Sequence, residues 1–268
     1  MTYYFILAGI GALMGVYGGL LGIGGSVVMI PALVLLWGEN QHLYQASAMI
    51  CNFFVAGSSA LAHRKADALM PEVVKFLIPA AVVGVLAGVA LSNSRLFAHG
   101  RSYLLARLFG IFLVYVVIYN CFRLARSFKG ITHRTVSGVR RSSPLVVFIG
   151  FVTGLGGGLL GMGGGAICVP LQQLLLKMPI RRAIANSAVT IISISLIGSV
   201  YKNLTLVGHG IEPTESLRIA AVVFPTAMVG GYFGGRLTHI LPRSVVRAAF
   251  ILLAAVAAYK MLTVPAGG

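Results

Sequence analysis

Two decapeptides in this chain share a residue pattern that could bind an anion. They are GIGGSVVMIP at residues 22–31 and GMGGGAICVP at residues 161–170. In both, glycines precede apolar residues that favour a helix, so Ser26 and Gly165 are expected in the first turn of a short helix with open amides. Such amides have no partner within the helix, lie at its positive end and attract small anions. The predicted binding residues here are Gly22, Gly24, Gly25, Ser26, Gly161, Gly163, Gly164 and Gly165.

A proline ends each decapeptide. Pro31 and Pro170 each remove a backbone donor, which frees a carbonyl group and bends the segment that follows the glycines. We predict that these bends lie beside a substrate site. Purely structural kinks are the alternative.

The helix expected after each decapeptide carries polar residues within an apolar sequence. They are Ser47, Asn52, Ser58 and Ser59 in the first helix, and Asn186, Ser187, Thr190, Ser193 and Ser195 in the second. Serine and threonine commonly form hydrogen bonds between membrane helices, whereas an asparagine amide in hydrocarbon needs a partner. We therefore predict that Asn52, Asn186 and Ser187 line the site. His63 and Lys202 lie near the ends of these helices, where they either gate an anion or extend to the membrane interface.

The acidic residues and cysteines exclude several kinds of site. All five acidic residues, namely Glu39, Asp67, Glu72, Glu212 and Glu215, fall in expected loops, which argues against a carboxylate proton relay or a sodium site. The spacing of the three cysteines suits neither a disulfide framework nor zinc. Because the chain has no G-x-S-x-G or H-E-x-x-H motif, we predict no cofactor, no metal and no enzymatic activity.

The composition indicates an all-α polytopic membrane protein. Of the 268 residues, 58% are hydrophobic and 10% are charged, and the mean hydropathy is +0.93. The net charge of +16 comes from cations near the ends of apolar segments, a pattern typical of topology signals and lipid headgroup contacts rather than nucleic-acid binding. The N-terminal apolar run has no preceding Lys or Arg and no cleavage motif, so we expect a membrane element rather than a signal peptide.

Further matches indicate that the chain consists of two repeats. Pro79, Gly84 and Gly88 have the same spacing as Pro225, Gly230 and Gly234. We predict a first membrane repeat at residues 1–122, a basic cytoplasmic linker at 123–143 and a second membrane repeat at 144–268. Helix packing is the expected role of a further set of glycines, namely Gly9, Gly11, Gly15 and Gly18, with Gly150 and Gly154 as their counterparts.

The first apolar run, residues 3–37, is too long for one straight membrane helix. It would measure about 50 Å, against a hydrocarbon core of roughly 30 Å. A turn at residues 22–25 would make a re-entrant or fully spanning hairpin, and three spanning helices would follow. The repeats would then be inverted, and most of the 21 Lys and Arg residues would share one side. The positive-inside rule places that side and the linker in the cytoplasm and both termini outside, in a cell (inner) membrane.

The paired G-x-G-G-x-x-x-x-x-P segments resemble the TauE/SafE family of sulfite and organosulfonate transporters, over nearly the whole chain. Arg182-Ala183 matches the basic-Ala pair that follows the glycine block in that family, whereas Gln45-Ala46 departs from it, and Ser26 stands where a third glycine is common. The resemblance implies secondary transport of sulfite or sulfonates, typically outward across the plasma membrane.

We therefore expect a transporter that works by alternating access around a midplane site. Its partners would be a small anionic substrate, such as sulfite or a sulfonate, and membrane lipid. The sequence specifies no oligomeric state. The alternatives are a transporter of another small organic anion, an intramembrane enzyme using Ser26 with His63, and an assembly subunit.

Overall fold

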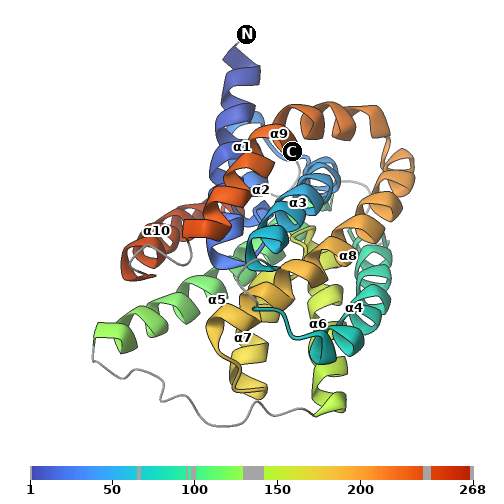
Figure 1. The fold of residues 1–268 in the computed structure, drawn as a ribbon. Coiled ribbons are helices and arrows are strands. Elements are labelled where there is room, and N and C mark those ends of the chain that lie inside the picture. Colours follow the sequence, from blue (N-terminus) through green and yellow to red (C-terminus); the bar gives the residue numbers. More distant parts are fainter. Residues whose placement is uncertain are drawn as a thin grey trace.

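A computed structural model describes residues 2–64, 68–94, 96–97, 101–128, 142–237 and 243–265, and every regular element in these ranges is helical (Figure 1). In chain order they are α1 (Thr2–Leu21), α2 (Ser26–Trp37), α3 (Gln41–Arg64), α4 (Pro71–Ser92), α5 (Ser102–Phe128), α6 (Ser143–Leu160), α7 (Gly165–Leu175), α8 (Ile180–Leu206), the 3-10 helix η1 (Val207–His209), α9 (Pro213–Leu237) and α10 (Arg243–Leu262). This order agrees with a broken hairpin followed by three longer helices in each half.

The first apolar run is broken and folds back, as its length predicted. Gly22 and Gly24 have φ angles of +62° and +79°, a region that glycine enters without steric cost. Helix α2 then returns along α1, because the Trp37 ring at its end lies 5.0 Å from the Tyr3 ring at the start of α1. With 12 residues, α2 is about 18 Å long, too short to span the hydrocarbon alone.

The second half repeats this break. Helix α6 ends at Leu160, and α7, with 11 residues, begins at Gly165. Gly161 and Gly163 have φ angles of +70° and +69°, which match their counterparts in the first turn. The turns differ at the residue before the short helix, where Gly164 has a φ of +80° and Gly25 has −82°.

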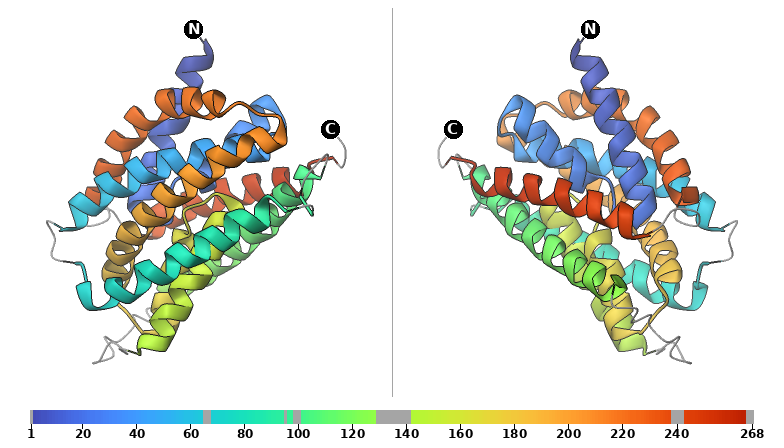
Figure 2. Two further views of the ribbon diagram at one scale, coloured as in Figure 1. Left: turned by 90° about the vertical axis from the view of Figure 1, so that its right-hand side faces the viewer. Right: turned by 90° about the vertical axis from the view of Figure 1, so that its left-hand side faces the viewer.

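Helices of one half pack mainly against helices of the other. Helix α1 lies along α9 and α4 lies along α6, while α5 and α10 run side by side (Figure 2). Glycines allow the close approach: a Cβ at Gly15 would lie 2.1 Å from the Ala227 carbonyl oxygen, and one at Gly154 would lie 2.0 Å from that of Ala81. The packing role expected of Gly9 is wrong, since a Cβ there would meet nothing within 4 Å.

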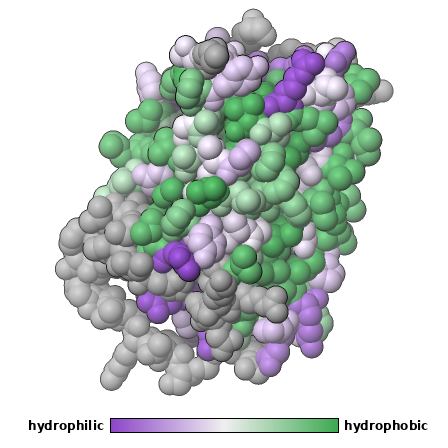
Figure 3. Space-filling model, turned by 45° about the horizontal axis from the view of Figure 1, so that its top comes forward, coloured by the Kyte–Doolittle hydropathy of each residue, from purple (hydrophilic) through white to green (hydrophobic). Residues whose placement is uncertain are grey.

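The surface is that of a membrane protein. Six helices in the described ranges are long and apolar enough to cross a bilayer, namely α1, α4, α5, α6, α8 and α9, whereas α3 and α10 fall outside this group. Large side chains such as Phe5, Ile111 and Leu252 are exposed. Hydrophobic residues cover most of the coloured face in Figure 3. Helix α5 continues to Phe128, into the segment assigned to the linker, and residues 129–141 lie outside the described ranges.

Candidate functional site

The two glycine turns, far apart in sequence, meet inside the protein. A Cβ at Gly24 would lie 2.8 Å from the carbonyl oxygen of Met162, and one at Gly165 would lie 2.5 Å from that of Gly22. Side chains larger than hydrogen would separate the two backbones. The structure thus brings predicted glycines of the first turn into contact with the second turn.

Asn52 caps the start of α2. Its Oδ1 accepts hydrogen bonds from the backbone N–H groups of Gly25 (2.9 Å) and Ser26 (3.3 Å), and its Nδ2 donates to Ser26 Oγ (3.0 Å). Asn52 and Ser26 are fully buried. The expectation that these two amides would be open is therefore wrong in this conformation, because a side-chain amide occupies the place predicted for an anion.

The start of α7 has no such cap: among the described residues, no side chain accepts a hydrogen bond from the amides of Gly164 or Gly165, the positions equivalent to Gly25 and Ser26. The Cγ2 atom of Ile191 would lie 2.9 Å from a Cβ at Gly163. Two polar atoms approach the same point: Asn52 Nδ2 and Ser195 Oγ would each lie 3.3 Å from that Cβ. The Ser195 hydroxyl is buried and has no hydrogen-bond partner among the described residues. Of the two turns, the second therefore keeps polar groups available to a ligand.

Helix α8 contacts the first turn as well as the second. Ser187 Oγ donates a 2.9 Å hydrogen bond to the Gly22 carbonyl oxygen, and the Ile184 side chain would lie 2.6 Å from a Cβ at Gly22. Asn186 faces elsewhere: its Nδ2 donates to Gln172 Oε1, and its Oδ1 accepts from the Met70 amide. Ser187 thus belongs to the junction of the turns, whereas Asn186 links α8 to α7 and to the start of α4.

The structure places the predicted bend and gate residues in different parts of the protein. Pro31 and Pro170 lie inside α2 and α7, and Pro170 lines the cavity described next. The structure does not describe the side chain of His63. Lys202 is 1% exposed and hydrogen-bonded inside the protein, so the expectation that it extends to the membrane interface is wrong.

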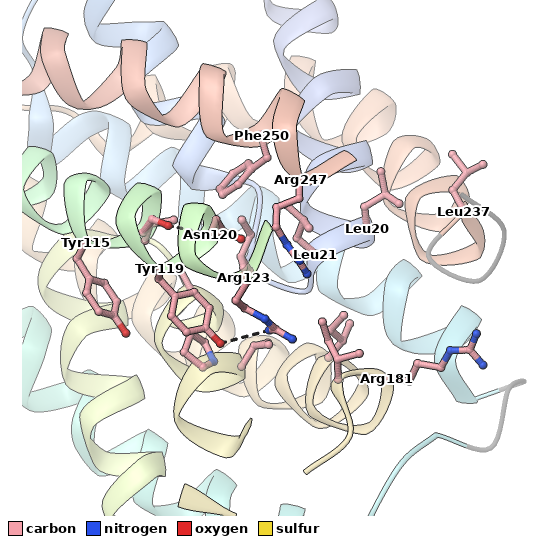
Figure 4. A pocket seen from close by; sticks show the side chains of 17 residues that line it. Leu20, Leu21, Tyr115, Tyr119, Asn120, Arg123, Arg181, Leu237, Arg247 and Phe250 are labelled. Carbon is pink, nitrogen blue, oxygen red and sulfur yellow. Dashed lines mark hydrogen bonds between the residues drawn. The ribbon is translucent and has the colours of Figure 1, made fainter. Parts of the chain in front are cut away.

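A cavity of about 60 Å³ lies next to the glycine turns, near the start of α8 (Figure 4). Its walls include Ile23 and Ala166, which lie in the first turn and at the start of α7. A cavity needs a volume of roughly 10–15 Å³ to hold one water molecule, so this cavity has room for several waters or a small ion. Three arginines also line it, namely Arg123, Arg181 and Arg247, and none of the described lining residues is acidic.

The arginines come from three different helices. Arg123 of α5 and Arg247 of α10 point toward the same space in Figure 4, while Arg181 of α8 lies at the margin with its guanidinium turned away. Arg123 Nη1 donates to Tyr119 Oη (3.2 Å) and to Gln173 Oε1. Arg247 is 8% exposed. The cavity therefore presents fixed positive charge near the turns.

Sequence reasoning did not select these arginines as site residues. They are distant in the chain, and each one alone fits the role of a topology signal. The one available signal was the charge count, because the inverted arrangement predicted from the sequence would place all three on the same, cytoplasmic side.

Two broken-helix hairpins that meet beside a basic cavity, in a polytopic helical membrane protein, are features of the secondary transporter class. The model of the family described as "Sulfite exporter TauE/SafE" matches residues 7–261, and the chain belongs to this family.

Relatives of the chain carry general transporter names. It is 29% identical to the "Probable membrane transporter protein MamO" of Magnetospirillum gryphiswaldense, over 93% of this chain but only 43% of MamO. It is 28% identical to the "Probable membrane transporter protein YunE" of Bacillus subtilis, over 90% of this chain and 89% of YunE. The chain thus spans less than half of MamO and most of YunE. No solved structure matches the chain.

Proposed function

We propose that the protein is a secondary transporter that carries small sulfur-containing anions, such as sulfite or organosulfonates, outward across the inner membrane. The observation that carries this proposal is the arginine-lined cavity, free of acidic side chains among its described residues, that reaches the glycine turns. A cation would be repelled there, whereas an oxyanion would be attracted.

The donors suit an oxyanion. Guanidinium groups offer paired N–H donors that match the geometry of oxyanions, and the uncapped start of α7 adds backbone N–H groups and a helix dipole. In this proposal Arg247 and Arg123 attract the anion into the cavity, and the amides at Gly164 and Gly165 hold its oxygens next to Ser195.

The contacts between the halves suggest how access could alternate. Because α8 contacts both turns, a rotation of one repeat against the other would move the turns relative to the arginines. We propose inverted repeats at residues 1–122 and 144–268 with a cytoplasmic linker at 123–143. The arginine cavity then opens to the cytoplasm, where an exporter collects its substrate.

An enzyme using Ser26 with His63 receives no support from the described contacts. The Ser26 hydroxyl is buried against the Asn52 amide, which is a donor and not a base. An assembly subunit would not need a basic cavity at the break of two helices.

The test is anion exchange in proteoliposomes that contain the purified protein. Radiolabelled sulfite and radiolabelled isethionate (2-hydroxyethanesulfonate) serve as separate probes, and unlabelled sulfonates compete. We expect saturable exchange of at least one probe. Absence of exchange with both probes would overturn the proposal.

A matched pair of variants tests the role of the cavity. We expect Arg247→Gln to raise the half-saturating anion concentration about tenfold, which corresponds to about 1.4 kcal/mol. Arg182→Gln is the control, because Arg182 is an exposed arginine that does not line the cavity. Equal effects of the two substitutions would contradict anion capture by this cavity.

A further inference from the structure

A second polar cluster lies at the other end of α8. Ile184 near the start of this helix lines the arginine cavity, and Lys202 lies about 27 Å further along the helix axis. Around Lys202 are His42 at the start of α3, Ser92 and Asn93 at the end of α4, and His209 in η1. The proposed transport mechanism uses none of these side chains.

Lys202 donates all of its hydrogen bonds to neutral groups. Its Nζ lies 2.9 Å from His42 Nδ1, 2.7 Å from Ser92 Oγ and 3.1 Å from Asn93 Oδ1. A protonated lysine has three N–H donors, so these three acceptors satisfy it completely. The cluster is therefore built to hold a protonated amine.

Within the described part of the chain, no carboxylate contacts Lys202. None of the three partners of Lys202 is acidic, and its side chain is 1% exposed. A buried ammonium without a counter-ion is costly, and an apolar residue of similar size would be tolerated better. Ionisable side chains inside membrane proteins commonly mark ion or proton pathways.

The geometry makes Lys202 and His42 share one proton. When Lys202 is protonated, His42 Nδ1 accepts its hydrogen bond, and the ring carries its proton on Nε2, which faces the Phe97 carbonyl oxygen at 3.4 Å. When Nδ1 is protonated instead, Lys202 must be a neutral amine in order to accept from it. The contact between the two nitrogens therefore has two alternative protonation states.

Water can reach the histidine side of this pair. A cavity of about 430 Å³ is lined by His42, His209, Glu39 and Ser102, among others. The His209 ring stacks on the His42 ring with centroids 3.8 Å apart and an interplanar angle of 16°. Glu39 accepts a hydrogen bond from Ser102. His42, His209 and Glu39 are the titratable groups that line this cavity among the described residues.

We propose that Lys202 and His42 form a proton-binding site that couples proton movement to anion transport and exchanges protons with this second cavity. In the release step, Lys202 Nζ gives a proton to His42 Nδ1 while His42 Nε2 gives its proton to a cavity water. The products are a neutral amine, a neutral imidazole protonated at Nδ1 and a hydronium ion, so atoms and charge balance. The inference rests on the proposed transport function, because it names the ion coupled to it.

Helix α8 connects the proton site with the anion site. Along this one helix, Ser187 holds the first glycine turn, Ile191 packs against the second, and Lys202 binds the proton. The bonds from Lys202 to Ser92 and Asn93 fix the end of α8 to α4. Loss of the proton leaves Lys202 with two N–H donors, so its bonds to Ser92 and Asn93 persist without charge assistance and hold this end of α8 less tightly.

The test uses full-length protein in proteoliposomes with radiolabelled isethionate, a permanently charged sulfonate, and radiolabelled sulfite. Two readouts are compared: exchange of labelled for unlabelled anion without a gradient, and accumulation driven by an imposed pH gradient. The variants are Lys202→Met, which removes the proton site, and Lys202→Arg, which keeps the charge but does not release a proton. Lys75→Met is the control, because Lys75 is an exposed lysine on α4.

We expect both Lys202 variants to reduce pH-driven accumulation by roughly tenfold or more while exchange persists, and Lys75→Met to behave as the wild type. If the wild type exchanges anions without responding to the pH gradient, or if Lys202→Met retains the response, the proton site is refuted and the transport proposal stands. If the wild type exchanges neither anion, both proposals fall. His42→Gln keeps an acceptor for Lys202 without a titrating ring, so it separates proton release from folding: it should also lose the pH response, and a retained response would remove His42 from the pathway.

Discussion

Replacing Asn52 with leucine tests whether the cap on α2 holds the glycine turns in place. The substitution removes three hydrogen bonds, two accepted from the amides of Gly25 and Ser26 and one donated to Ser26 Oγ. Leucine fills a similar volume, so the main loss is polar. We expect the variant to insert into the membrane but to be less stable and inactive in anion exchange.

The size of the effect follows from these contacts. Interhelical hydrogen bonds in membrane proteins contribute about 0.6 kcal/mol each on average, and a buried donor left without a partner costs about 1–3 kcal/mol. A total near 3 kcal/mol is expected for Asn52→Leu, and for a chain of this size that lowers the apparent melting temperature by roughly 6–12 °C. Ser187→Ala is the reference, because Ser187 is equally buried but makes one bond, to the Gly22 carbonyl.

The assay is thermal unfolding of detergent-purified protein, followed by exchange measurements in proteoliposomes. Ser187→Ala should lower the melting temperature by roughly 2–4 °C, about a third of the effect of Asn52→Leu. The reasoning is refuted if the two variants melt at the same temperature, or if Asn52→Leu exchanges anions at the wild-type rate.

Three further predictions concern packing, charge and the second turn. Gly15→Ala should destabilise the protein by about 1–3 kcal/mol because its Cβ would lie 2.1 Å from a carbonyl oxygen of α9, whereas Gly9→Ala on the same helix should not; equal melting temperatures would contradict the close helix contact. Arg181→Gln should raise the half-saturating anion concentration by only about two- to fivefold in exchange kinetics, because this arginine is exposed at the cavity margin; an effect larger than that of Arg247→Gln would contradict the geometry. Gly163→Ala should abolish exchange without preventing membrane insertion, since its φ of +69° and its contacts with α8 leave no room for a Cβ; exchange at the wild-type rate would remove this turn from the site.

The broken hairpins could be predicted because their causes are local. Residues 3–37 are too long for one straight span, and the glycines at 22 and 24 permit positive φ angles. The same reasoning located the second break at residues 161–164. The contact between the two turns, in contrast, depends on the packing of α8 and α3 around them, which no spacing within either decapeptide encodes.

The polar contacts could be predicted only as residue types. The cost of a bare amide in hydrocarbon correctly required a partner for Asn52, but the partner is the amide end of α2 and leaves no opening there. The sequence grouped Lys202 with His63 because both lie near helix ends, but it did not predict the contact of Lys202 with His42. Arg123 and Arg247 come together only because α5 and α10 run side by side, a contact between residues far apart in the chain.

The exchange of helix partners between the halves has a consequence for biogenesis. Ribosomes deliver the first half to the membrane before the second exists, and at that stage the glycine-lined grooves of α1 and α4 have only lipid to face. The helices that pack against them in the folded protein, α9 against α1 and α6 against α4, come later in the chain. We therefore expect a nascent chain truncated after α5 to remain unfolded in the bilayer and to be degraded, and co-expression of the two halves as separate polypeptides to rescue it.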